Sequence, residues 1–154
     1  MQRECIKETI KELYESGIEA ILIGKEVATL FKESPYSLSQ LNFVVREEGL
    51  RRLSQSHMPK YSNEECFIFE RCNTTFSFGT PTYYGIMKAP FEYEEKSLDE
   101  VKVKVRPLRF VIEDYERMKE RMEKAAEKIG DKDLKSRSVY KEVEDIIEFL
   151  KKES

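Results

Sequence analysis

Hydrophobic residues recur every three or four positions near both ends of the chain, which is the spacing of an amphipathic helix. The first such segment places three apolar residues on one face, namely Ile6, Ile10 and Leu13. Ser16-Gly17 then supplies a stop, because glycine tolerates the left-handed cap conformation. Two longer stripes occupy residues 110–152 and are separated by Gly130-Asp131. The pattern predicts one helix at the start and a pair of helices at the end.

Short, nearly continuous apolar runs predict strands that are buried on both faces. They span Ile18 to Ile23 and Leu41 to Val45, and Gly24 ends the first of them. Between the two runs, Lys25 to Lys32 has helical spacing, and the Ser34-Pro35-Tyr36-Ser37 segment is typical of a turn. After the second run, a further helix is predicted from Glu47 to Gln55.

The middle of the chain favours strands. Cys66 to Glu70 and Thr75 to Phe78 are rich in aromatic residues that suit strands, and Val101 to Val105 alternates between apolar and charged residues. Pro107 stops that last strand, and the stretch from Gly79 to Ser97 is expected to be irregular. This order of elements predicts a single α+β domain over residues 1–154, with a small mixed β-sheet flanked by helices.

Charge and hydropathy exclude several classes of protein. The 154 residues include 30 acidic and 27 basic side chains, so the net charge of −3 argues against general nucleic-acid binding. No apolar run approaches the roughly 20 residues that cross a bilayer, and the first residues lack the apolar core of an export signal. We therefore expect a cytoplasmic protein without membrane association.

The three cysteines fit that expectation. Cys5, Cys66 and Cys72 are an odd number, so the sequence implies no closed disulfide framework, and buried or half-buried thiols are the simplest interpretation. His57 is the only histidine, and the spacing of Cys66 and Cys72 does not suit a zinc knuckle. We predict neither a metal site nor a catalytic Cys-His pair from these residues.

One arrangement carries candidate chemistry. A buried strand ends at Gly24, a short helix follows, and Gln40-Leu41-Asn42 opens the next strand. This arrangement resembles the nucleotidyltransferase superfamily, which has the DNA polymerase β-like fold, and in particular its small prokaryotic members. The tail is also similar to that of such members, with the features Val101 to Val105, Pro107-Leu108, Tyr115 to Lys119 and Asp131-Lys132-Asp133.

The resemblance implies a site for a nucleoside triphosphate and Mg²⁺. In that family a glycine lets the backbone approach the phosphates, and two carboxylates at alternate positions of the next strand hold the metal. A third carboxylate on a nearby strand completes a two-metal site. Here the corresponding positions carry amides and a hydroxyl, namely Gln40, Asn42 and Ser77, and Lys25 follows Gly24 where the family has glycine or serine. The site is therefore expected to have lost its metal and its catalysis.

Each candidate residue has a binding interpretation and a structural one. Lys25 could contact a phosphate or could be a solvent-facing helix residue. Gln40 and Asn42 could hydrogen-bond a base or sugar, or could cap a loop. The adjacent Tyr83 and Tyr84 could stack on a base, form a partner surface or simply pack.

Three functions follow as hypotheses. The first is a catalytically degenerate nucleotidyltransferase-like protein that acts by binding a nucleotide or a protein partner, including a second copy of itself, and needs no cofactor. The second is an active transferase that uses Mg²⁺ held by acids from elsewhere, such as Glu47, Glu48 or Glu70. The third is a regulatory subunit, for example half of a toxin–antitoxin-like pair, in which the helical tail docks a partner.

Overall fold

The computed structural model describes residues 2–32 and 38–154, and the turn predicted at residues 34–37 lies outside them. The chain forms two compact units, residues 1–107 and residues 108–154. The first unit contains four helices within its described part, which are α1 (Gln2–Glu15), α2 (Glu26–Thr29), α3 (Glu47–Ser56) and α4 (Pro81–Tyr84). Its strands are β1 (Ile21–Ile23), β2 (Gln40–Val44), β3 (Tyr61–Ser62), β4 (Cys66–Arg71), β5 (Thr74–Gly79), β6 (Glu94–Leu98) and β7 (Val101–Val105).

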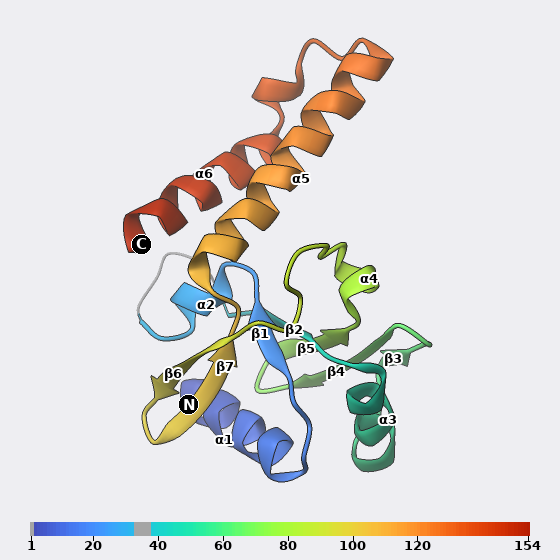
Figure 1. The fold of residues 1–154 in the computed structure, drawn as a ribbon, viewed down its shortest axis with the longest axis vertical. Helices are drawn as coiled ribbons and strands as arrows, with labels where there is room; N and C mark the ends of the chain where they lie inside the picture. Colours follow the sequence, from blue (N-terminus) through green and yellow to red (C-terminus); the bar gives the residue numbers. More distant parts are fainter. Residues whose placement is uncertain (1, 33–37) are drawn as a thin grey trace. The chain divides into compact units, whose positions relative to one another are not determined.

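The strands form one mixed sheet in the order β3-β4-β5-β2-β1-β7-β6. β1 pairs antiparallel with β2 and parallel with β7, whereas β2 pairs parallel with β5. The link between β1 and β2 passes through α2. The predicted mixed sheet flanked by helices is thus confirmed at this level, with β1 and β2 as central neighbours (Figure 1).

One face of the sheet is strongly apolar and aromatic. Leu22, Phe43 and Phe78 are cross-strand neighbours on β1, β2 and β5, and the rings of Phe43 and Phe78 stack with centroids 5.1 Å apart. Helices α1 and α3 lie on this side of the sheet, whereas α4 lies on the other (Figure 1). The inward residues of α1 are fully buried, as its stripe predicts, and they are Ile6, Ile10 and Leu13.

The opposite face carries the positions that the sequence singles out. Side chains alternate along a strand, so Ile23, Asn42 and Ser77 share this face with Ile21 and Val44. A small apolar cluster covers part of it and consists of Ile21, Ile23, Val44 and Ile86, with Tyr84 and Phe91 packed against them. The segment after β5 therefore folds back over the face that contains the candidate site.

The expectation of an irregular stretch from Gly79 to Ser97 is wrong in two places. Thr80 caps α4 by accepting a hydrogen bond from the Tyr83 backbone N–H, and Pro81 occupies the first turn, where its missing N–H costs nothing. β6 pairs with β7 along its whole length. Four of its five residues are exposed, so it lacks the apolar alternation by which strands are recognised in a sequence.

The expectation of three free thiols is also wrong. Cys5 in α1 and Cys72 in the β4–β5 turn form a disulfide, with Cα atoms 5.6 Å apart and a sequence separation of 67. Cys66 is the remaining cysteine, and it is free and buried. An odd count excludes complete pairing of the cysteines but does not exclude one bridge between residues that the fold brings together.

The second unit is a helical hairpin. Helix α5 (Leu108–Ile129) and helix α6 (Ser138–Glu153) are joined by a short 3₁₀ turn, η1 (Leu134–Ser136), which follows the predicted break at Gly130. The two helices pack side by side and are linked by ion pairs between Lys119 and Glu144 and between Lys151 and Glu116. Their bounds confirm the predicted pair at residues 110–152 to within a few residues.

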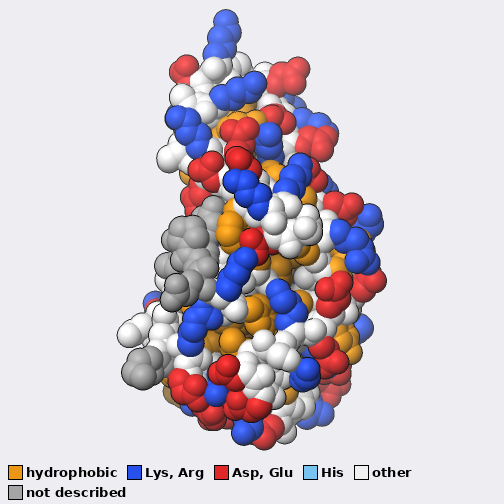
Figure 2. Space-filling view, turned by 90° about the vertical axis from the view of Figure 1, so that its left-hand side faces the viewer, with side chains coloured by type: hydrophobic (Ala, Val, Ile, Leu, Met, Phe, Trp, Pro, Cys, Tyr) orange, Lys and Arg blue, Asp and Glu red, His pale blue; other side chains and the backbone are white. Residues whose placement is uncertain are grey.

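The surface does not carry charge of a single sign. Figure 2 shows Lys and Arg interspersed with Asp and Glu over the face that it displays, with hydrophobic side chains between them. This mixture agrees with the small net charge. No helix within residues 2–32 and 38–154 is both long enough and apolar enough to cross a membrane.

Candidate functional site

The sheet register brings the predicted site residues together. Asn42 on β2 lies opposite Ile23 on one side and opposite Ser77 of β5 on the other. Gly24 follows Ile23 directly and has a φ of 75°, a left-handed conformation that glycine adopts without strain. Gln40 lies two residues before Asn42 and therefore on the same face of β2. Three of the predicted positions thus lie on the adjacent strands β2 and β5, and Gly24 directly follows the neighbouring strand β1.

The polar groups of this site bond to one another. The Gln40 amide nitrogen Nε2 donates to the Asn42 Oδ1 at 2.8 Å. The Asn42 residue is half-buried, whereas Gln40 is exposed. Ser77 is buried, and its Oγ lies 3.0 Å from the Tyr84 hydroxyl. The same hydroxyl donates to the Ser77 backbone carbonyl at 2.9 Å. The group therefore consists of two hydrogen-bonded pairs, one of amides and one of hydroxyls, without a formal charge.

Tyr84 is the site residue whose position the sequence did not reveal. Burial, above all, raises the pKa of its hydroxyl, so the side chain is a neutral donor at physiological pH. Its ring packs against the apolar cluster beside the site, and α4 directs it there. The sequence signal was the Thr80-Pro81 pair, a cap followed by a first-turn proline, which marks a helix start.

Lys25 is not the freely exposed helix residue that one interpretation expected. Its Nζ forms an ion pair with the Glu26 Oε2 at 2.8 Å, and its side chain is only 23% exposed. The Glu26 carboxylate is almost fully buried, and that burial raises its pKa while the Lys25 ammonium partly opposes the rise. A phosphate at this position would therefore compete with Glu26 for the charge of Lys25.

The residues present do not fit a two-metal centre. Mg²⁺ requires oxygen ligands that include carboxylates, whereas the three corresponding positions offer two amides and a hydroxyl. The acid that follows Gly24 and Lys25 in the sequence is Glu26, and its carboxylate is paired with Lys25. Among the described residues, no group of three or more His, Cys, Asp or Glu side chains could hold a metal ion.

The acids proposed as substitutes lie in two places. Glu47 and Glu48 begin α3, beyond the end of β2, and Glu48 pairs with Arg52 at 3.4 Å. Glu70 lies on β4 opposite Thr75, which in turn lies opposite Gln40, so two strand spacings of about 4.8 Å separate Glu70 from Gln40. Its carboxylate pairs with Lys60 at 2.7 Å. Only Glu70 is on the face of the site.

A cleft of about 560 Å³ lies at the other end of β1. Basic and acidic side chains alternate around it, with Lys104 paired to Glu19 at 3.2 Å and Arg52 paired to Glu48. These two ion pairs reduce the positive field that would attract a phosphate. The candidate site therefore remains the group around Asn42 rather than this cleft.

Comparison with models of protein families, with curated proteins and with solved structures finds no match for this chain. The sheet register and the chemistry of the residues at the candidate site therefore carry the functional proposal.

Proposed function

We propose that this chain is a nucleotidyltransferase-like domain that binds a nucleotide without transferring it. One observation carries the proposal: Asn42 lies between the end of β1 and Ser77 of β5, where the family resemblance requires carboxylates. The placement of Gln40, Asn42 and Ser77 suits the family, but their side chains are neutral. Loss of three carboxylates removes the charge that holds divalent metal, while the site keeps hydrogen-bonding groups.

The chemistry of the site favours a base or sugar as the recognised part of the ligand. An amide offers both donors and an acceptor, so Gln40 and Asn42 can meet the mixed edge of a nucleobase. Their mutual hydrogen bond keeps both side chains ordered before binding, which lowers the entropy cost of association. Lys25 adds one cation beside the left-handed turn at Gly24, at the expense of its bond with Glu26.

Titration with a fluorescent ATP or GTP analogue tests the proposal. We expect saturable binding that is equal in Mg²⁺ and in a chelator, because no carboxylate cluster is available to recruit the metal. Asn42→Ala should weaken binding, whereas Gln55→Ala should not, since Gln55 is an exposed amide on α3. Absence of binding in the wild type, or incorporation of a labelled nucleotide that requires Mg²⁺, would contradict the proposal.

A second candidate function is partner binding by the helical unit. Ile129 at the end of α5 and Val139 near the start of α6 are 79% and 63% exposed, which is unusual for aliphatic side chains beside one connection. This favours the hypothesis of a regulatory subunit. Light scattering coupled to size-exclusion chromatography should detect self-association, and Ile129→Ser with Val139→Ser should abolish it.

A further inference from the structure

The Cys5–Cys72 bridge joins α1 to the turn between β4 and β5. Cys5 lies in the first turns of α1, and Cys72 lies in the two-residue turn between β4 and β5. Both residues are half-exposed, whereas Cys66 is buried. A small reductant in solution can therefore reach the bridge more readily than it can reach the third cysteine.

The backbone at Cys72 supports a specific role for this side chain. Cys72 and Asn73 both have positive φ, 64° and 54°, as in the tight turns that suit the twist of a hairpin. Glycine, asparagine and aspartate usually occupy such positions, because a side chain in the left-handed region is disfavoured. Asn73 follows this preference and Cys72 departs from it. The disulfide to Cys5 offsets the conformational cost of a cysteine at this position.

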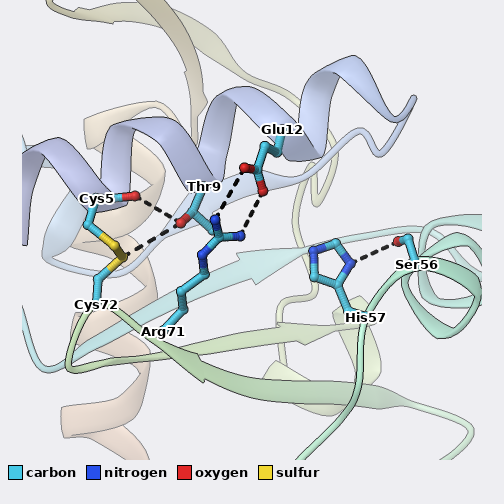
Figure 3. A network of polar contacts seen from close by, with 7 residues as sticks. All are labelled: Cys5, Thr9, Glu12, Ser56, His57, Arg71 and Cys72. Atoms are coloured by element: carbon cyan, nitrogen blue, oxygen red, sulfur yellow. Dashed lines mark hydrogen bonds and ion pairs between the residues drawn. A yellow bond between two sulfur atoms is a disulfide. The ribbon is translucent and has the colours of Figure 1, made fainter.

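Polar contacts surround the bridge and hold the same two elements together. The Thr9 Oγ1 donates to the Cys5 carbonyl at 2.8 Å and lies 3.6 Å from the Cys72 Sγ (Figure 3). Arg71 forms a bidentate pair with Glu12 at 2.7 and 3.2 Å. Gln2 donates to the Cys72 carbonyl at 3.3 Å. These bonds keep α1 near the turn when the disulfide is absent, so that the two sulfur atoms can meet again.

Arg71 lies between Cys72 and His57 (Figure 3). The imidazole stacks on the ring of Phe69, with centroids 4.9 Å apart, and its Nδ1 faces the Ser56 hydroxyl at 2.8 Å. His57 is thus engaged elsewhere and does not serve as a base for Cys72. The chemistry available to the bridge is therefore exchange with an external thiol, rather than internal acid–base catalysis.

The first turn of α1 also reaches α2. Arg3 donates through its guanidinium to the carbonyls of Thr29 and Leu30, which belong to the end of α2. α2 begins directly after Gly24 and Lys25 of the candidate site. Arg3 therefore links the first turn of α1 to the end of the helix that follows Gly24.

We propose that Cys5 and Cys72 form a redox-sensitive clamp that fastens the first turns of α1 to the β4–β5 turn and loosens this attachment, without separating the two elements, on reduction by a dithiol. The dithiol breaks the bond between the two Sγ atoms and forms its own disulfide. Two electrons and two protons pass to the cysteines, which become thiols. The reverse reaction, with an oxidised dithiol, closes the clamp. This inference does not depend on nucleotide binding.

Counting of thiols in denaturant is the first test. After treatment with oxidised glutathione and removal of that reagent, we expect one thiol per chain, from Cys66, and three after dithiothreitol. Peptide mapping should find the bridge between residues 5 and 72. Three thiols in the oxidised sample, or a bridge that involves Cys66, would overturn the proposal.

Hydrogen exchange is the second test, because it reports on α1 directly. Reduction should speed exchange at the amides of residues 6–10 in α1 and at Leu30, which follows α2, while the amides of β5 and β2 stay protected within the sheet. The unfolding equilibrium constant should rise roughly 30- to 1,000-fold, as expected for loss of a disulfide that closes a long loop. Equal exchange in α1 before and after reduction would refute the clamp.

Matched variants separate the bridge from other effects of the reductant. Cys5→Ser with Cys72→Ser should behave like the reduced protein and should no longer respond to dithiothreitol. Cys66→Ser removes the other cysteine and should keep the full response. If the Cys66→Ser protein loses the response, or if the double variant keeps it, the clamp is not at Cys5 and Cys72.

Discussion

Ser77 lies directly opposite Asn42 in the parallel pairing of β5 with β2, and its hydroxyl contacts the Tyr84 hydroxyl rather than a solvent-exposed ligand. The position of Ser77, where the proposed nucleotidyltransferase resemblance would call for a third carboxylate, is therefore occupied by a buried pair of hydroxyls. This relationship defines a site that can hydrogen-bond but cannot concentrate negative charge.

The first prediction concerns metal. Wild-type protein should show no saturable binding of Mn²⁺ or Mg²⁺ at micromolar concentration in calorimetry. Gln40→Asp with Asn42→Asp places two carboxylates at alternate positions on one face of β2 and should create a site for Mn²⁺. Gln55→Asp adds an acid on α3 and serves as the control. A wild-type site that disappears in Asn42→Ala would contradict this prediction.

The second prediction concerns phosphate. If a nucleotide binds, Lys25→Met should weaken ATP binding about 10- to 150-fold, which corresponds to about 1.5–3 kcal/mol for a charge-assisted hydrogen bond. The loss should shrink at high salt. Because Lys25 also pairs with the buried Glu26, the variant should be compared with Lys25→Met combined with Glu26→Gln. Equal affinity of the wild type and both variants would show that Lys25 does not contact the ligand.

The third prediction concerns pH. Burial raises the pKa of Glu26, so the folded protein binds more protons at this group than the unfolded chain does. The contribution of Glu26 to stability is therefore most favourable at low pH and declines as pH rises from about 4.5 through the higher folded pKa.

Glu26→Gln should remove this decline. Denaturant unfolding between pH 4 and pH 8 should show the variant gaining stability relative to the wild type as pH increases. Glu8→Gln changes an exposed carboxylate on α1 and should give a constant difference. A Glu26→Gln difference that does not vary with pH would mean that the carboxylate does not titrate abnormally.

The fourth prediction concerns the hydroxyl pair. Tyr84→Phe leaves the buried Ser77 hydroxyl without its partner and should cost about 1–3 kcal/mol of unfolding free energy. At this chain length, each kcal/mol corresponds to about 2–4 °C in Tm. Tyr93→Phe, which removes the hydroxyl of a tyrosine that is 46% exposed, is the matched control and should change Tm little. Equal Tm values for the two variants would argue against the bond.

Local patterning was sufficient for most of the secondary structure. The alternation of Val101 to Val105 gave a strand with the observed bounds, and the stripes at residues 110–152 gave the two final helices. It failed for β6, whose polar residues are held in place by hydrogen bonds to β7 rather than by a buried face. Backbone pairing of an exposed edge strand leaves no periodic signal in the side chains.

The sequence by itself determined which side chains stand at the candidate site, and hence that the Gln40, Asn42 and Ser77 positions lack acids. Only the tertiary structure decided that Tyr84 enters this site, that Lys25 pairs with Glu26, and that Cys5 meets Cys72 across 67 residues. The physical reason is the distance in sequence between the residues that make each contact. Periodicity reports on neighbours within one helix or strand, whereas these contacts depend on how strands pair and on where the connecting segments cross the sheet.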